Sequence, residues 1–484
     1  MATHKKQKKF RRVKSPARRG DSTGSQTSAR LNASNIFFLL LGLGVLIRII
    51  VFAHIGYLNN DNHLEVVEHV ARTWLPARAD QFNQGYHPPL YYFLAAFFYL
   101  IGGAPAVRIF SLLLSVATLA LIALVLRQLP WISASLGNWA VALAALHPQF
   151  VLFGLFISND TLAIFLGALL CYQCRRLQLA PSIANHSLLG IYLGLGLLTK
   201  AAFLAFVLPL CLFVWLNGRE RAVAHAQIVQ RLLIFAIAAT VLGVYKYAEQ
   251  FVLFGNPFVS NLDLADWVKD QRPTWIGISS LLDINLVKLM IHPVVGSHTV
   301  HSYPLMTYAS FWYAFIPEST FMSNLIVPLN RIGSAIYLLA LVPTALIISG
   351  IAVSARALFL LFVRGQTIDE TQSRQRAILE GAFVIALVLN LFLILAIGWR
   401  YDAWSVFQGR LLFSAYFAIL LSLIRGLELV PPLRSWQLLF RLALGVLLTL
   451  FLFYFVIEVV LARTYPPTLF TTPHIGNNID MRSP

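Results

Sequence analysis

Long apolar runs recur along almost the whole chain and are separated by short polar stretches. Eleven of these runs are long enough to cross a membrane as helices, and they cover residues 36–55, 105–126, 139–157, 160–175, 186–199, 201–217, 231–251, 334–355, 377–398, 410–425 and 437–461. A transmembrane helix needs about 20 predominantly apolar residues, within a range of about 17–25. The pattern therefore predicts an all-α polytopic membrane protein with about eleven transmembrane helices, within limits of about 10–13.

One further apolar stretch, 89–102, decides the predicted topology. A basic N-terminal segment favours the cytoplasm, so the loop after the first run is expected outside. If 89–102 is a short or re-entrant helix, the arginine-rich loops lie inside and most acidic residues lie outside. If it crosses fully, every later loop changes side. The positive-inside rule favours the first alternative, which places the C-terminal segment 463–484 outside the cytoplasm.

The composition excludes a soluble globular protein. Of the 484 residues, 58% are hydrophobic and 12% are charged, whereas soluble domains carry roughly 25% charged residues. The formal net charge of +17 is concentrated near the N-terminus, where residues 1–33 predict a disordered basic cytoplasmic tail. Such a tail serves as a topology signal and contacts anionic lipid headgroups. The alternative, a nucleic-acid-binding arm, lacks interleaved aromatic residues, so we expect no nucleic-acid partner.

No repeat and no separate soluble domain interrupts the apolar pattern. Residues 34–462 are expected to form a single transmembrane domain with two substantial outer loops, 56–104 and 252–333. Each loop is predicted to contain interfacial helix, and the amphipathic stretch 280–290 is the candidate in the second. The three cysteines lie within or beside apolar runs and are too few for a zinc site, which needs about four ligands.

An acidic segment follows the first apolar run. Asp61, Glu65, Glu68 and Arg72 are spaced so that they share one face of a short helix. Such a helix, lying on the membrane, would present carboxylates to a substrate between lipid and water. Asp61 would open this helix, where it could equally act as its N-cap. For Glu65 and Glu68, a solvated acidic face is the simpler interpretation.

Several short motifs follow one another in a fixed order. They are His87-Pro88-Pro89-Leu90-Tyr91-Tyr92, Ala106-Val107-Arg108-Ile109-Phe110-Ser111, Leu146-His147-Pro148, Ser158-Asn159-Asp160, Gly196-Leu197-Leu198-Thr199-Lys200 and, near the end, Gln408-Gly409-Arg410-Leu411-Leu412. In this order they resemble the polytopic membrane glycosyltransferases of the C superfold, in particular protein O-mannosyltransferases and lipid A aminoarabinose transferases. The resemblance covers residues 36–215 and afterwards only the last motif.

This resemblance implies transfer of a sugar from a polyprenyl phosphate or diphosphate on the non-cytoplasmic face. In such enzymes an acidic residue just after the first span serves as base or metal partner, and Asp61 occupies that position. Many members have an adjacent Asp-Glu pair, whereas Asn62 follows Asp61 here, so Glu65 is the nearest substitute by helix geometry. Asp61 and Glu65 are therefore the predicted catalytic residues. A divalent cation, Mg²⁺ or Mn²⁺, is a candidate cofactor that the sequence leaves undetermined.

Five further polar residues are predicted to bind the substrate, and they are His87, Asp160, Lys200, Arg400 and Arg410. Each has a simpler alternative. His87 and Lys200 could anchor the chain at the membrane interface, and Asp160 could act only on the dipole of the helix that it begins. Arg400 could pair with the nearby Asp402. Arg410 is the preferred ligand for the lipid phosphate, because arginine binds phosphate with two parallel hydrogen bonds.

Some polar residues are given structural roles or remain open. Arg48 and Arg108 lie within or beside apolar runs and are expected to pack or to snorkel. The irregular spacing of His292, His298 and His301 is a weak indication of a metal site.

Taken together, the sequence predicts an inverting mannosyltransferase-like enzyme in a bacterial plasma membrane, with its active site outside the cytoplasm. It would use a polyprenyl-phosphate sugar donor and a protein, lipid or glycan acceptor. The alternatives are a lipid or sugar transporter and a catalytically inactive assembly protein. A transporter would concentrate its polar groups at the bilayer midplane and show paired repeats, which this sequence lacks.

Overall fold

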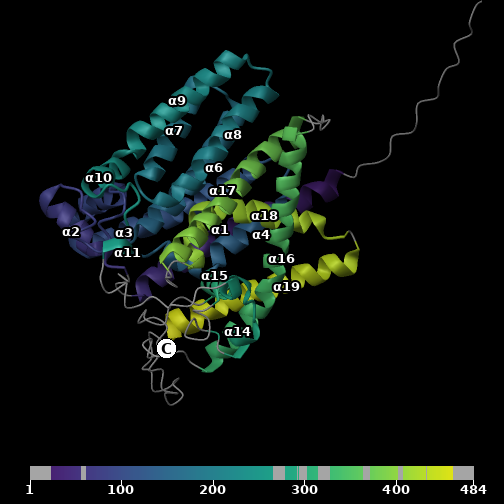
Figure 1. The fold of residues 1–484 in the computed structure, drawn as a ribbon. Coiled ribbons are helices and arrows are strands. Elements are labelled where there is room, and N and C mark those ends of the chain that lie inside the picture. The colour runs from purple at the N-terminus through teal and green to yellow at the C-terminus, as the bar shows by residue number, and fades with distance from the viewer. Residues whose placement is uncertain are drawn as a thin grey trace, which may run out of the picture.

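The computed structural model describes residues 23–55, 61–264, 278–291, 293, 302–313, 327–363, 371–401, 407–431 and 433–461. Within these residues the chain is a helical bundle without strands, which confirms the all-α prediction (Figure 1). The first half of the chain forms α1 (Thr23–His54), α2 (His63–Thr73), α3 (Leu90–Gln128), α4 (Ala134–Leu146), α5 (Pro148–Phe153), α6 (Asn159–Leu179), α7 (Ile183–Leu197), η1 (Ala201–Phe203), α8 (Leu204–Glu220), α9 (His225–Gly243) and α10 (Tyr245–Phe254). The second half forms α11 (Asn261–Leu264), α13 (Ile278–Leu282), α14 (Val287–Ile291), α15 (Tyr303–Trp312), α16 (Val327–Val363), α17 (Thr371–Tyr401), η3 (Gly409–Ala415), α18 (Tyr416–Leu429), α19 (Arg434–Tyr454) and η4 (Phe455–Leu461).

Many of these helices have the length and composition of membrane spans. Among the described residues, eight helices are long and apolar enough to cross, and α4 and α7 are shorter apolar helices. The protein is therefore an integral membrane protein, while the total of about eleven crossings stays a prediction. Two of the predicted runs are divided in the structure: 139–157 is split between α4 and α5 at His147, and 231–251 between α9 and α10 at Val244.

The stretch 89–102 is continuous with the following span but is bent away from it. Both belong to α3, whose backbone leaves the helical conformation at Gly102 and Gly103, and Pro105 follows within the next turn. At about 1.5 Å per residue, a helix of 39 residues is far longer than the roughly 30 Å hydrocarbon core. The break therefore supports two separate segments, although whether the first one crosses stays a prediction.

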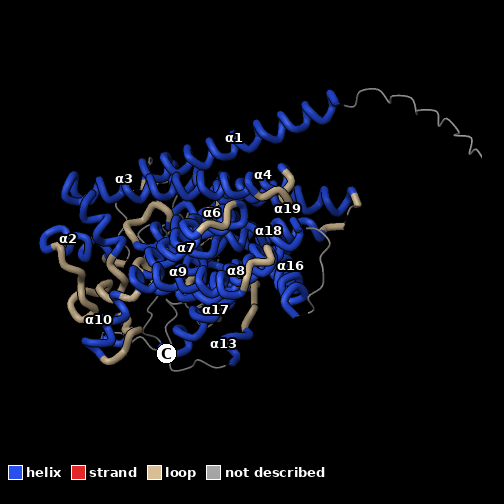
Figure 2. Tube along the Cα trace, turned by 90° about the horizontal axis from the view of Figure 1, so that it is seen from above, coloured by secondary structure: helices blue, strands red, loops and turns tan. Residues whose placement is uncertain are grey.

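The helices in two of the predicted regions differ from the expected ones in detail. The amphipathic stretch 280–290 forms two short helices, α13 and α14, because residues 283–286 between them are not helical. At the N-terminus, α1 begins at Thr23, inside the segment 1–33 that was expected to be a tail, and extends beyond the rest of the bundle (Figure 2). Residues 1–22 and 463–484 lie outside the described part of the chain.

Arginine-rich loops meet at one end of the bundle, which we call the basic end. Their contacts there are Arg175 to the Gln128 carbonyl, Gln178 to the Gln375 carbonyl, Arg374 to Glu220, and Arg376 and Arg425 to Glu428. These residues lie at the ends of α3, α6, α8 and α18 and at the beginning of α17. The beginnings of α6 and α18 therefore lie at the opposite end, which carries the site described next.

Candidate active site

Two carboxylates and two cations from four distant parts of the chain meet in one cluster. Arg410 donates from Nη2 to Oδ2 of Asp61 at 2.8 Å, and its Nη1 lies 3.7 Å from Oδ2 of Asp160. Lys200 donates to the other oxygen of Asp160. The side chains of Asp160 and Arg410 are each 9% exposed, that of Lys200 12% and that of Asp61 30%. We call these four residues the charge cluster.

Asp61 reaches the cluster from a turn and not from a helix. Helix α2 begins at His63, and Asn62 at its N-cap position has a left-handed backbone (φ 56°) and no side-chain capping bond. The predictions that Asp61 caps this helix and shares its face with Glu65 are therefore wrong. Because the left-handed backbone of Asn62 separates Asp61 from the helix, the helical spacing does not determine where the Asp61 carboxylate lies.

Helix α2 is held firmly against α3, and this fixes the turn that carries Asp61. Val66, Val67 and Val70 are fully or almost fully buried on its inner face. Burying a valine side chain contributes roughly 1.5 kcal/mol or more. In both views α2 lies at the same end of the bundle as α10 (Figures 1 and 2). Lys246 of α10 donates to the Ala77 carbonyl in the segment after α2, which joins the two.

Asp160 and Lys200 are positioned by a contact between two predicted motifs. Asp160 lies in the first turn of α6, and Ser158 caps that helix by accepting from the Asp160 backbone N–H at 3.2 Å. The Asn159 side chain donates to the Thr199 carbonyl at 3.3 Å, next to Lys200. A carboxylate at a helix N-terminus is favourable by itself, but this one also binds two cations, so its role extends beyond the helix dipole.

Arg410 is held in place by α15 and α6. The Gly409 backbone N–H donates to the Ser310 hydroxyl at 2.8 Å, and a Cβ added at Gly409 would lie 2.7 Å from the Phe311 backbone. A Cβ at Gly167 of α6 would likewise lie 1.9 Å from the Ser414 carbonyl oxygen. Both glycines therefore permit a close backbone approach that larger residues would prevent. The guanidinium of Arg410 also lies over the Phe153 ring, at 4.8 Å from its centroid.

His147, from the Leu-His-Pro motif, links the two segments that hold Arg410. It is fully buried, with Nε2 2.7 Å from the Phe311 carbonyl oxygen and Nδ1 3.1 Å from the Tyr416 hydroxyl. Gln149 donates to the Tyr313 carbonyl two residues further along. These bonds fix the end of α15 and the beginning of α18, between which Arg410 is held.

A group of histidine and tyrosine side chains lies beside the charge cluster. The His63 and His87 rings are stacked with centroids 5.6 Å apart, and the Tyr86 ring lies 4.0 Å from that of His87. Burial lowers the pKa of His63 to about 4, and burial together with the neighbouring His63 lowers the pKa of His87 well below its usual value. Both imidazoles are therefore neutral near pH 7. His63 escaped the sequence analysis, because the helix-face interpretation considered only the charged positions of its segment.

The electrostatics favour an ionised Asp61. Burial, the largest single effect, would raise the pKa of this carboxyl, but the charge and hydrogen bond of the Arg410 guanidinium, together with the neighbouring His63, hold the pKa below its usual value. Within the cluster two negative charges balance two positive charges. An incoming anion can therefore bind the cations only by competing with Asp61 and Asp160.

Of the three other predicted site residues, His87 lies beside the charge cluster, whereas Glu65 and Arg400 lie apart from it. Glu65 is exposed on α2, and the helix directs its neighbour Glu68 toward Arg72 and Tyr99 instead. Arg400 is 56% exposed and pairs with Asp263 at 3.3 Å, so Asp263 is the partner that the structure shows. Asp402, the partner expected from the sequence, lies outside the described residues, as do His292, His298 and His301.

The cluster does not have the composition of a metal site. Among the described residues, no group of three or more His, Cys, Asp and Glu side chains is arranged to hold a metal ion. Asp61 and Asp160, the nearest candidates, are both paired with Arg410. The residues present therefore do not fit a metal held by the protein, and we derive no step through one.

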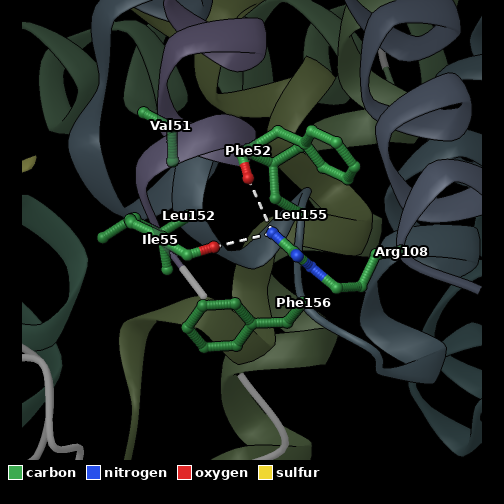
Figure 3. Close-up of a pocket in the computed structure, with 7 residues that line it drawn as sticks. All are labelled: Val51, Phe52, Ile55, Arg108, Leu152, Leu155 and Phe156. Carbon is green, nitrogen blue, oxygen red and sulfur yellow. Dashed lines mark hydrogen bonds between the residues drawn. The ribbon is translucent and has the colours of Figure 1, made fainter. Parts of the chain in front are cut away.

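Two arginines, the buried Arg48 and the half-buried Arg108, have structural roles, as the sequence analysis expected. Arg48 is fully buried and donates to Ser115 and to the carbonyl oxygens of Gly44, Ala144 and Ala145. Arg108 lines a small pocket at the end of α1 and donates to the Phe52 and Ile55 carbonyls, both at 2.6 Å (Figure 3). A cation at a helix C-terminus satisfies carbonyls that lack partners within the helix.

Comparison with known proteins agrees with the motifs. A family model described as dolichyl-phosphate-mannose-protein mannosyltransferase matches residues 86–244. This confirms the resemblance to polytopic membrane glycosyltransferases of the C superfold over that part of the chain, which includes His87, Asp160 and Lys200 but neither Asp61 nor Arg410. No curated protein matches the sequence.

Solved structures also match the chain at low identity. The ArnT structure from Cupriavidus metallidurans bound to undecaprenyl phosphate is 15% identical, with 84% of this chain and 77% of that chain covered and a TM-score of 0.33. The apo ArnT structure from the same organism is 14% identical, with 83% and 80% covered and a TM-score of 0.36.

Proposed function

We propose that this protein transfers a sugar from a polyprenyl-phosphate-linked donor to an acceptor on the non-cytoplasmic face of the membrane, with inversion at the anomeric carbon. The observation that carries the proposal is the charge cluster, in which the carboxylate of Asp160 lies beside two largely shielded cations, Lys200 and Arg410. The matched family is named for a lipid-phosphate sugar donor and for mannosyl transfer, which supports this donor class and makes mannose the first sugar to test.

The two cations are suited to the leaving group. In the proposed reaction an acceptor oxygen or nitrogen forms a bond to the anomeric carbon while the bond from that carbon to the phosphate oxygen breaks. The departing lipid phosphate gains negative charge. Arg410 and Lys200 stabilise this charge, and they do so effectively because both are largely shielded from water. A single displacement of this kind inverts the configuration of the carbon.

Asp61 is suited to the role of base. It is the most exposed member of the charge cluster, so an acceptor can approach it. While it is paired with Arg410 it is a poor base, because the cation stabilises its ionised form. When the donor phosphate takes over Arg410, Asp61 loses that partner, its affinity for a proton rises, and it removes the proton of the attacking acceptor. Donor binding thus prepares the base.

The position of the charge cluster supports the proposed side of the membrane. The basic end gathers the arginine-rich loops, which the positive-inside rule assigns to the cytoplasm. Asp160 lies at the beginning of α6 and Lys200 directly before η1, which leads into α8, whereas the basic end lies at the ends of α6 and α8. The charge cluster would then face away from the cytoplasm, in a bacterial plasma membrane on our proposal.

The direct test uses the Asp61→Asn variant in purified protein supplied with a mannosyl phosphoprenol, and glucosyl and aminoarabinosyl phosphoprenols as further donors. We expect the wild type to consume one of these donors and the variant to lose nearly all turnover while its melting temperature is kept. The matched control is Asp263→Asn, which removes an outer carboxylate that pairs with Arg400 instead. Full activity of the Asp61 variant would reject this base, and a wild type inactive with all donors would reject the function.

A further inference from the structure

A chain of hydrogen bonds runs from helix α3 into the charge cluster through His63, which has no role in the proposed reaction. Nδ1 of His63 lies 2.8 Å from the Tyr92 hydroxyl, and Nε2 lies 3.3 Å from the Ser158 hydroxyl. The Ser158 hydroxyl in turn lies 3.3 Å from Oδ2 of Asp160. His63 and Ser158 are each 2% exposed and Tyr92 1%, so water does not compete for these bonds.

The direction of each bond follows from the number of protons available. A serine hydroxyl has one proton to donate. The ionised Asp160 has none, so the Ser158 proton goes to that carboxylate. Ser158 must then accept from Nε2–H of His63. A neutral imidazole carries only one ring proton, so Nδ1 is an acceptor. The Tyr92 hydroxyl gives its single proton to Nδ1 at 2.8 Å and not to the Gln84 carbonyl oxygen, which lies further away at 3.4 Å.

The neutral state of His63 agrees with its surroundings. Lys200 and Arg410 both lie close enough to disfavour a third positive charge, and burial acts in the same direction. Asp61 and Asp160 favour the charged form but do not outweigh burial. The aromatic contacts leave the ring little freedom, since it is stacked on His87 and lies 5.9 Å from the Tyr92 centroid.

We propose that His63 is a positioning residue which, as the neutral Nε2–H tautomer, orients the Asp160 carboxylate through Ser158 and thereby fixes Lys200 and Arg410 for the donor phosphate. This rests on the proposed function, because it assigns the two cations to a phosphate. In this chain of hydrogen bonds every donor points toward Asp160. The Asp160 side chain therefore keeps one rotamer when Lys200 and Arg410 turn from the carboxylates to the donor phosphate. Tyr92 and Ser158 are intermediates in the same chain.

The first test compares two substitutions at position 63. His63→Phe keeps the ring and its stacking but removes both hydrogen bonds, and we expect kcat/KM for the phosphoprenyl sugar to fall by about tenfold or more. His63→Gln keeps a side-chain N–H that can reach Ser158, so it should recover most of that loss. The matched control is His69→Phe on the same helix, whose ring contacts Phe82 and not the charge cluster. Wild-type activity in His63→Phe would overturn the proposal.

A double-mutant cycle separates positioning from general packing. If His63 acts through Ser158, then Ser158→Ala should cost about as much as His63→Phe, and the double variant should be no worse than either one. The same cycle can be measured on the binding of an unsugared prenyl phosphate. Fully additive losses in both measurements would show that the two residues act independently and would contradict the chain.

The tautomer can be observed without any turnover. Nitrogen-15 NMR of histidine-labelled protein, assigned with the His63→Gln variant, should show Nε2 protonated and Nδ1 unprotonated from pH 7 down to about pH 5. A reversed tautomer, or titration near pH 6.5, would overturn the proposal. This measurement also separates failure of the proposed function from failure of the role proposed for His63. A wild type that transfers no sugar refutes the function, whereas the spectrum still tests the hydrogen bonds of His63.

Discussion

Arg410 and Asp61 lie 349 positions apart in the sequence, yet Nη2 of the arginine donates to Oδ2 of the aspartate at 2.8 Å. The same guanidinium approaches Asp160 with its other terminal nitrogen at 3.7 Å. One planar group thus bridges two carboxylates from different parts of the chain. In the proposed mechanism Arg410 stays paired with the two carboxylates until the donor phosphate replaces one of them.

The bridge predicts that lysine cannot replace Arg410. A lysine carries its charge at a single point and cannot span both carboxylates. We expect Arg410→Lys to lose roughly 10²–10³-fold in kcat/KM, comparable with the loss of a transition-state donor. The measurement is sugar transfer from the phosphoprenyl donor at saturating acceptor. Arg400→Lys is the matched control, since that exposed arginine pairs with Asp263, and it should stay within about twofold of wild type. Equal losses in both variants would contradict the assignment.

The structure gives Glu65 no contact with the charge cluster, although the sequence analysis predicted it to be catalytic. It was the predicted second carboxylate, but it is exposed on α2. We therefore expect Glu65→Gln to change turnover and melting temperature only slightly, because exposed substitutions usually change stability by no more than about 0.5 kcal/mol. Asp61→Asn, assayed beside it, supplies the comparison. A loss of turnover as large as that of the Asp61 variant would restore Glu65 to the catalytic group.

The acidic segment shows where reasoning from the sequence succeeded and where it stopped. The lengths of the apolar runs were sufficient to predict an all-α membrane fold. The acidic segment after the first run led to Asp61, and the short motifs led to Asp160, Lys200 and Arg410. The helix-face argument failed at Asn62, because its positive φ breaks the register, and a non-glycine residue in that conformation leaves no periodic signal.

Contacts between residues that lie far apart in the sequence could not be predicted from the sequence either. The pairing of Arg400 with Asp263 depends on two helices, α17 and α11, that the fold brings together, and a local interpretation could only offer a neighbour in sequence. His63 was overlooked for a similar reason. Its importance comes from Ser158, which caps α6, and from Tyr92 of α3, and not from any pattern around position 63.

Buried neutral histidines predict a loss of stability in acid. The pKa of His63 is about 4 in the folded protein and about 6.5 when unfolded, so between these values the unfolded state binds more protons. The contribution to stability is complete above about pH 6.5 and is lost as the pH falls toward 4, on the order of 3 kcal/mol in all. The melting temperature in detergent should therefore drop from pH 7.5 to pH 5.

The variant His63→Gln tests this assignment. It should have a shallower dependence of the melting temperature on pH than the wild type, although some dependence stays because His87 is shifted in the same direction. His69→Gln is the matched control and should keep the wild-type slope. An unchanged slope in the His63 variant would mean that other groups cause the acid sensitivity.

The close approach of η3 to α15 predicts that Gly409 tolerates no side chain. A Cβ at this position would lie 2.5 Å from Cβ, 2.7 Å from Cα and 2.7 Å from N of Phe311, and backbone atoms cannot move aside as the end of a flexible side chain can. Gly409→Ala should therefore push η3 away from α15 and break the bond between its N–H and Ser310. Because Arg410 is the next residue, its guanidinium would leave the carboxylates. We expect a destabilisation of about 1–3 kcal/mol and at least a tenfold loss in kcat/KM.

Gly445 offers the matched control for that substitution. It lies within α19, and an added Cβ there would meet nothing within 4 Å. Alanine is favoured over glycine inside a helix by roughly 0.5–1 kcal/mol, so Gly445→Ala should keep full activity and melt no lower than the wild type. Melting in detergent and sugar transfer, measured on both variants, separate the effect of position 409 from that of any glycine replacement. If Gly409→Ala kept wild-type turnover, the contact with α15 would not position Arg410, and the cation could reach the phosphate without that support.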